Sequence, residues 1–125
     1  MGWQLDKNRP IYIQLVEELQ SRIVSGAYPP GAKVDSVRDL AAEAAVNPNT
    51  MQRALAELEQ SGLLRAERTS GRFVTEDEEL IAAVRKSLAK EKIEAFVRDM
   101  SVLGYRKQDM IILVKETLEG EDNYG

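Results

Sequence analysis

Residues 36–64, SVRDLAAEAAVNPNTMQRALAELEQSGLL, contain two helix-start signals in close succession. Ser36 is a favourable N-cap residue, and apolar residues follow it at helical spacing. Asn47-Pro48 is a second start signal, because an Asn side chain accepts a hydrogen bond from a free backbone N–H and proline suits the first helical turn. The stretch therefore predicts two helices joined by a tight turn, with the second helix ending near Ser61.

The chain before this pair predicts another amphipathic helix. It begins at Pro10 and continues to Gly26, with apolar residues at three- and four-residue spacing. Residues 28–31, Tyr-Pro-Pro-Gly, predict a turn, because neither proline suits a helix interior. The apolar face of this helix consists of Ile11, Leu15, Val16, Leu19 and Ile23.

After the pair, the pattern changes from helix to strand. Residues 63–67 and 72–75 predict two short strands around a polar turn. Two short helices followed by such a hairpin are typical of a winged helix-turn-helix, which we assign to residues 1–75. The fold class predicted is mainly α with a small β-hairpin.

The helical pattern returns in residues 76–125, for which a two-helix hairpin is expected. A long helix begins near Asp77 and ends at Gly104, which suits a left-handed helix cap. A last helix begins near Lys107. The acidic, polar residues 119–125 are expected to fray.

The composition excludes most catalytic and metal chemistry. The chain of 125 residues has no His and no Cys, which removes imidazole bases, thiol nucleophiles, disulfides and nearly all transition-metal sites with N or S ligands. We therefore expect no catalytic residue, no metal and no cofactor. The carboxylate run EDEE at 76–79 lies at a predicted helix start, where the helix dipole favours negative charge, so a solvated helix start explains it better than an active site.

Charge and hydropathy bound the partners. No apolar run approaches the roughly 20 residues that span a bilayer, and the first residues do not resemble a signal peptide, so we expect a cytoplasmic protein with no membrane partner. The net charge of −4 alone disfavours nucleic acid. However, residues 1–75 carry nine bases and nine acids, and the excess acid lies in residues 76–125.

The third predicted helix begins with polar side chains suited to DNA. In a helix-turn-helix, the second helix of the pair places its N-terminal side chains in the major groove. This helix carries no carboxylate before Glu57, and the hairpin turn adds arginines and a glycine that allows close approach. The residues that we predict to contact double-stranded DNA are Asn47, Asn49, Thr50, Gln52, Arg53, Arg68, Ser70, Gly71 and Arg72.

Each of these residues also has an explanation that does not involve DNA. Helix capping alone accounts for Asn47. Gln52 and Arg53 suit any solvated helix surface, and Gly71 suits any tight turn. The arginines of the hairpin alternatively serve solubility.

Several motifs are spread over residues 8–75: PIYIQL at 10–15, IVSGAYPPG at 23–31, SVRDLA at 36–41, NPNT at 47–50, GLL at 62–64 and GRFV at 71–74. Together they resemble the winged helix-turn-helix of the GntR family of bacterial regulators. The resemblance implies that Ser36 and Arg38 lie near the DNA backbone and groove edge. It also implies that Asn49, Thr50 and Gln52 lie on the recognition helix, and Gly71 on the wing.

Three positions depart from the family pattern. Asp35 stands where the family usually has proline, Gln52 where it often has a basic residue, and Thr69 where it often has glycine. An acid at position 35 weakens local attraction to phosphate. Gln52 is expected to shift base preference from guanine towards adenine.

The part of the chain after the wing predicts dimerisation. About fifty residues follow the wing, and this length with a two-helix pattern resembles the YtrA-type subfamily, in which a short helical hairpin forms the dimer. Apolar residues recur at helical spacing from Leu80 to Met100 and from Met110 to Leu118, and two helices with such stripes cannot bury both faces on each other alone. We predict a homodimer through Leu88, Phe96, Met100, Met110, Leu113 and Val114.

The predicted function is sequence-specific regulation of transcription, by a repressor that binds a palindromic operator as a homodimer. Repression is favoured by family analogy. One alternative is a switch with a pocket for an unknown small-molecule effector near Phe96, Met100 and Tyr105, although few polar groups converge there. Two others are a tail that folds back as a monomeric lid, and a winged helix that binds protein, which the polar side chains of the third helix disfavour.

Overall fold

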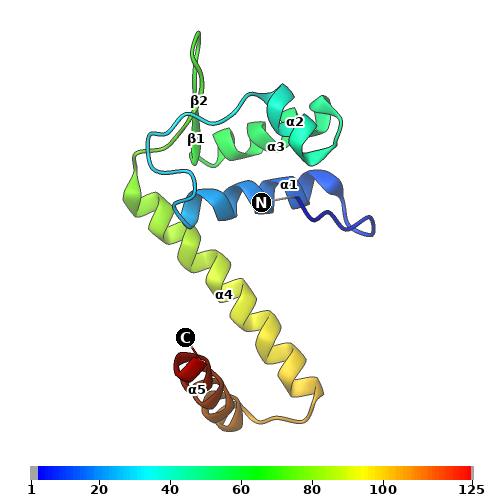
Figure 1. Ribbon diagram of the computed structural model, residues 1–125, viewed down its shortest axis with the longest axis vertical. Coiled ribbons are helices and arrows are strands. Elements are labelled where there is room, and N and C mark those ends of the chain that lie inside the picture. The colour runs from blue at the N-terminus through cyan, green and yellow to red at the C-terminus, as the bar shows by residue number, and fades with distance from the viewer. Residues whose placement is uncertain (1–2, 125) are drawn as a thin grey trace. The chain divides into compact units, whose positions relative to one another are not determined.

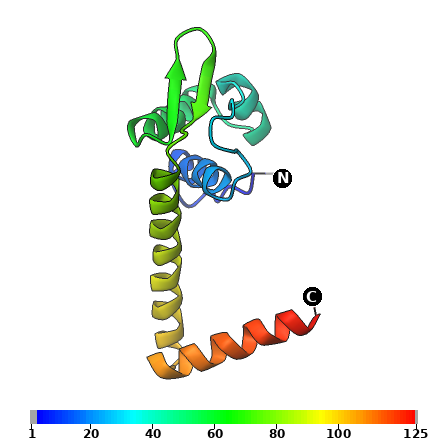
Figure 2. The same ribbon diagram turned by 90° about the vertical axis from the view of Figure 1, so that its left-hand side faces the viewer.

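The computed structural model describes residues 3–124, with side chains up to residue 120. Within these residues it contains five helices and one two-stranded sheet, so the predicted mainly α class with a small β-hairpin is confirmed (Figure 1 and Figure 2). In chain order the elements are α1 (Ile11–Val24), α2 (Val37–Ala44), α3 (Pro48–Gln60), β1 (Leu64–Glu67), β2 (Gly71–Val74), α4 (Glu78–Val102) and α5 (Lys107–Tyr124).

The first three helices pack around one apolar core. Both α1 and α2 pack against α3, and α3 also contacts β1. Three- and four-residue spacing places the apolar residues on one face of each helix, which explains why those faces are buried. The large side chains with almost no exposure are Leu15, Leu19, Ile23, Leu40, Met51, Leu55, Leu58, Leu63 and Val74.

The turn between α2 and α3 requires left-handed backbone. Ala45 has φ 57° and ψ 47°, and the N–H of Val46 donates to the carbonyl of Ala41 at 3.0 Å. A Cβ atom in this conformation is crowded by the following carbonyl, at a cost of roughly 1–2 kcal/mol. The tight turn therefore carries a strained residue at the centre of the helix-turn-helix.

The strands β1 and β2 form an antiparallel hairpin that we call the wing, residues 64–74. Leu64 pairs with Val74 at its base, and Glu67 pairs with Gly71 near its turn. Leu64 and Val74 are buried in the core, whereas the turn of the hairpin projects away from the helices (Figure 2). The wing is thus anchored at one end and free at the other.

Arg22 ties α1 to the segments around it. Its guanidinium donates to Glu18 at 3.0 Å, to the Tyr28 hydroxyl at 2.8 Å and to Glu43 of α2 at 3.3 Å, and it lies 4.5 Å from the centre of the Trp3 ring. Burial acts to lower the pKa of Arg22, but its hydrogen bonds outweigh burial and raise the pKa above the ordinary value. The side chain therefore stays charged and paired.

The chain divides into two compact units within α4. Met1–Arg85 forms the first, which we call the head unit, and Lys86–Gly125 forms the second, the tail unit. The head unit extends past residue 75, where the sequence places the domain boundary, because Ile81 in the first turns of α4 is buried in the core of the head.

The last two helices, α4 and α5, end in different ways. Gly104 follows α4 with φ 94°, so the predicted left-handed cap is confirmed. Helix α5 continues to Tyr124, so residues 119–124 are helical, whereas the fraying expected for residues 119–125 stays a prediction and residue 125 lies outside the described residues. Glutamate is a good helix former, and a helix lengthens cooperatively from the turns before it. No helix among the described residues is long and apolar enough to cross a bilayer.

Candidate nucleic-acid interface

The N-terminus of α3 is closed by a single residue, Asn47. Its side-chain oxygen accepts from the N–H of Asn49 at 2.7 Å, and its carbonyl accepts from Thr50 at 3.0 Å and Met51 at 3.2 Å. The remaining residue of this turn, Pro48, has no N–H to satisfy. Every backbone donor of the first turn is thus paired, so Asn47 acts as a helix cap in this structure.

The outward face of this helix start is polar and available. Asn49 and Gln52 are exposed, Thr50 is half-buried, and the first turn contains no acidic residue. The face opposite them carries the buried Met51 and Leu55, so the helix cannot rotate without losing its core contacts. These contacts hold Asn49 and Gln52 facing solvent.

Arg53, the next residue predicted to contact DNA, packs against α1. Its guanidinium carbon lies 3.6 Å from the centre of the Tyr12 ring, which is a close cation–π contact. Tyr12 belongs to the first turn of α1. The pairing holds Arg53 against the side of α3, which distinguishes it from the free Gln52 beside it.

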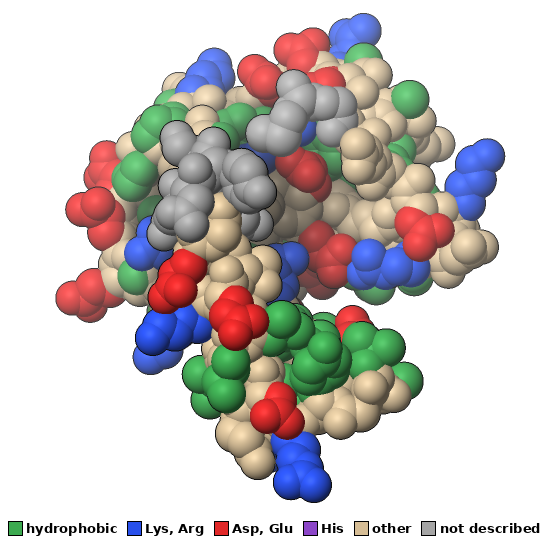
Figure 3. Space-filling model, turned by 60° about the horizontal axis from the view of Figure 1, so that its bottom comes forward, with side chains coloured by type: hydrophobic (Ala, Val, Ile, Leu, Met, Phe, Trp, Pro, Cys, Tyr) green, Lys and Arg blue, Asp and Glu red, His purple; other side chains and the backbone are tan. Residues whose placement is uncertain are grey.

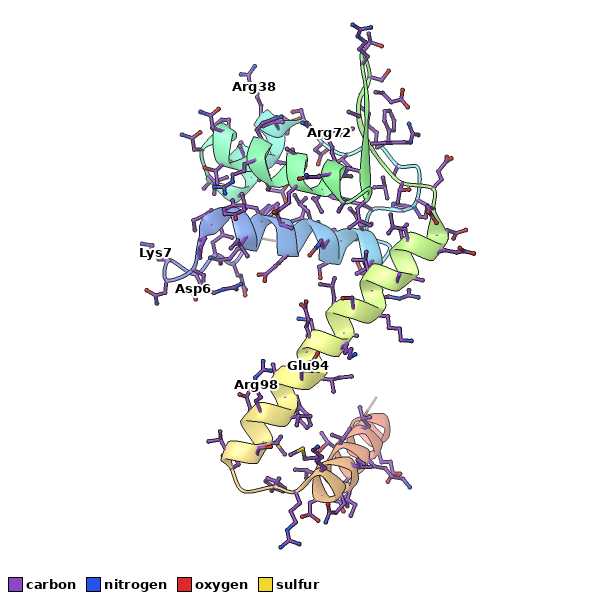
Figure 4. The ribbon with its side chains drawn as sticks, turned by 180° about the vertical axis from the view of Figure 1, so that it is seen from behind. Asp6, Lys7, Arg38, Arg72, Glu94 and Arg98 are labelled. Atoms are coloured by element: carbon purple, nitrogen blue, oxygen red, sulfur yellow. The ribbon has the colours of Figure 1, made fainter. Side chains whose placement is uncertain are left out.

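The two predicted residues at the start of α2 have different surroundings. The Ser36 hydroxyl accepts from the N–H of Asp39 at 3.1 Å and caps the helix. Arg38 is exposed and extends away from the helices (Figure 4). Among the side chains of residues 3–120, Arg38 has no ion-pair partner, so its charge is available to a ligand.

The arginines of the wing are not equivalent. Arg68 and Ser70 lie in its exposed turn, next to Gly71 with φ 103°. Arg72 instead forms an ion pair with Glu59 of α3, and only 19% of its side chain is exposed. The sequence contains no local signal for this pair, since its members are 13 residues apart and meet only when the wing folds onto α3.

A separate candidate site lies in the tail unit, where an apolar groove of about 1130 Å³ runs between α4 and α5. Among the predicted dimerisation residues, Phe96, Met110 and Val114 line the groove, whereas Leu88, Met100 and Leu113 are half-buried outside it. The groove is also lined by four apolar residues that the sequence places on apolar stripes but not in the predicted interface. These are Ile93, Val97, Ile111 and Leu118.

The groove is open to solvent although its walls are apolar. Ile111 is 71% exposed and Ile93 60% exposed. Apolar side chains gather over this part of the surface (Figure 3). Charged residues lie around them: Glu94 and Arg98, one turn apart on α4 (Figure 4), with Lys107 and Lys115 on α5.

Comparison with known proteins places these features in one family. Residues 11–74 match the family described as bacterial regulatory proteins, gntR family. The chain is 36% identical to an uncharacterised HTH-type transcriptional regulator, YhcF, of Bacillus subtilis, over 96% of this chain and 99% of the relative. It is 30% identical to the HTH-type transcriptional repressor YtrA of the same organism, over 86% of this chain and 83% of the relative.

Solved structures agree in fold. A GntR family transcriptional regulator from Listeria monocytogenes matches with a TM-score of 0.83 and 41% identity, over 90% of this chain and 98% of that chain. The DNA-binding domain of AraR, in complex with its operator ORX1, matches with a TM-score of 0.52 and 29% identity, over 60% of this chain and 92% of that chain. The motifs of residues 10–74, the winged helix-turn-helix and these similarities together show that the chain belongs to the GntR family of bacterial regulatory proteins.

Proposed function

We propose that this GntR-family regulator binds double-stranded DNA with the start of α3 in the major groove and the wing beside it. The observation that carries the proposal is the polar, acid-free outer face of α3, with Asn49 and Gln52 exposed and held there by a buried opposite face. Arg38 and Arg68 flank this face as exposed cations. The operator complex of the similar AraR domain supports the same assignment.

Within this interface the predicted residues divide into three groups. Asn49, Thr50 and Gln52 contact base edges, and Arg38 and Arg68 contact phosphates. The residues that shape the surface rather than contact a base are Ser36, Asn47, Arg53, Ser70, Gly71 and Arg72, because capping, stacking, turn geometry or an ion pair accounts for each of them.

We further propose that two copies associate through the groove of the tail unit. An open groove lined by Ile93, Phe96 and Ile111 exposes apolar side chains to water, and packing against the same region of a second copy removes them from water. The charges around the groove include both signs, so Glu94 of one copy can face a lysine of the other across a two-fold axis. A dimer then presents two copies of α3 to a palindromic operator.

A small-molecule effector is the second candidate occupant of the groove. The groove is large enough for one, but seven of its eleven lining residues are apolar, whereas effector pockets enclose a few converging polar groups. Of the residues predicted for an effector pocket, Phe96 lines the groove, and Met100 and Tyr105 do not. A second copy therefore explains the groove better.

Repression is the direction of regulation that we propose. A dimer bound over a promoter excludes polymerase by occupying the site, without requiring a further contact surface. The name of the similar YtrA, a transcriptional repressor, supports this direction. Regulation of transcription also supports a location in the cytoplasm.

The experiment is selection of bound sequences from random duplex DNA by the purified chain, at two salt concentrations. Enrichment of a palindrome that persists at the higher salt is expected, since base contacts depend less on salt than phosphate contacts do. Sedimentation of the same sample is expected to give twice the mass of one chain. A monomer that enriches single half-sites would contradict the dimer, and a folded dimer that enriches nothing would favour an effector or a protein partner.

A further inference from the structure

The segment before α2 pairs with the wing along β2. The N–H of Gly31 donates to the Val74 carbonyl at 3.0 Å, the N–H of Val74 donates to Ala32 at 2.9 Å, and the N–H of Val34 donates to the Arg72 carbonyl at 2.9 Å. Residues 31–34 therefore pair with β2 on the side opposite β1, and Lys33 lies directly across from Phe73. This pairing fixes the backbone of Lys33 relative to the wing.

Residues 31–34 are extended, so successive side chains point to opposite faces, and this alternation decides where the Lys33 side chain lies. Val34 is buried in the core of the head, so its neighbour Lys33 faces outward and is exposed. Lys33 Cε lies 3.4 Å from the position that a Cβ atom on Gly71 would occupy. The aliphatic part of Lys33 thus passes over Gly71 and carries the ammonium group along the outer face of the wing.

Some of the basic side chains on and beside the wing form ion pairs, and others do not. Arg65 is paired with Glu67, and Arg72 with Glu59. Among the side chains of residues 3–120, neither Lys33 nor Arg68 has an ion-pair partner. Asp35, two residues after Lys33, does not form an ion pair with it. The free positive charge on the wing therefore consists of Lys33 and Arg68.

We infer that Lys33 is a DNA-binding residue of the wing, where its ammonium group donates to a phosphate oxygen of the duplex. The inference rests on the proposed function, since it assigns a further contact to the same interface. Lys33 takes the role that the sequence suggests for Arg72, whose charge is neutralised by Glu59. Gly71 lies within van der Waals distance of the aliphatic part of Lys33, which places the Lys33 side chain beside the turn of the wing.

The test is the salt dependence of binding to a short duplex of mixed sequence, measured for the full chain by fluorescence anisotropy. Each phosphate contact contributes about 0.9 to the slope of log K against log salt. Lys33→Gln removes the charge and is expected to reduce the slope by about 0.9 per chain, or about 1.8 for a dimer that engages both wings. Lys33→Arg is expected to keep the wild-type slope.

The matched control is Lys90→Gln in the tail unit, which removes one positive charge from an exposed residue outside the DNA interface and the groove and is expected to leave the slope unchanged. A slope for Lys33→Gln equal to that of the wild type would overturn the assignment, as would an equal loss in the control. Circular dichroism melting checks that each variant is folded. A wild-type chain that binds no duplex at any salt concentration would instead overturn the proposed function itself.

Discussion

Substitution of Asn47 separates its capping role from base contact. In Asn47→Ala the only backbone donor that loses its partner is the N–H of Asn49, because the Asn47 carbonyl still accepts from Thr50 and Met51. That N–H is exposed, so water replaces the lost bond and the free energy of unfolding falls by about 1 kcal/mol, the usual cost of losing an N-cap. For a unit of this size the melting temperature is expected to fall by about 4–8 °C.

Asn47→Ser is the informative companion. Serine caps helices as well as asparagine does, so the melting temperature is expected to stay near that of the wild type. If Asn47 only caps α3, DNA affinity is also retained, whereas loss of an asparagine that pairs with a base costs about 1–3 kcal/mol. Melting at one protein concentration and anisotropy titration with the selected operator measure the two quantities. A serine variant that melts normally but binds its operator tenfold or more weakly, a loss of about 1.4 kcal/mol, would refute the assignment of Asn47 to capping alone.

Three further predictions test the remaining assignments. Arg38→Ala is expected to weaken binding to all duplexes and to reduce the salt slope by about 0.9 per chain. Gln52→Ala is expected to change the selected sequence more than the non-specific affinity. Equal behaviour of the two variants in titrations would contradict the assignment. Val114→Asp places a charge in the groove and is expected to give folded monomers by sedimentation. The control Ile112→Asp, which is also on α5 but outside the groove, is expected to leave the dimer intact. A dimeric Val114→Asp variant would place the interface elsewhere. Ala45→Gly relieves the left-handed backbone and is expected to raise the free energy of unfolding by about 0.5–1 kcal/mol in urea titrations, and a destabilised variant would argue against strain at this turn.

Local signals account for the features that the sequence predicts correctly. Ser36 and Asn47 cap their helices because a side-chain oxygen and a backbone N–H two or three residues away meet without help from the rest of the chain. Gly104 ends α4 because only its own backbone freedom is needed. Apolar periodicity likewise predicts the buried faces of the first three helices, since each face follows from the geometry of one helix.

The sequence by itself therefore determined the fold class, the order of elements and the family of this protein. Only the tertiary structure decided which of its cations are free. Arg72 meets Glu59, Arg53 meets Tyr12, and Lys33 lies across from Phe73 through contacts between segments distant in the chain. Such contacts depend on how helices and strands pack, and a charge that looks available in the sequence is neutralised or exposed by that packing alone.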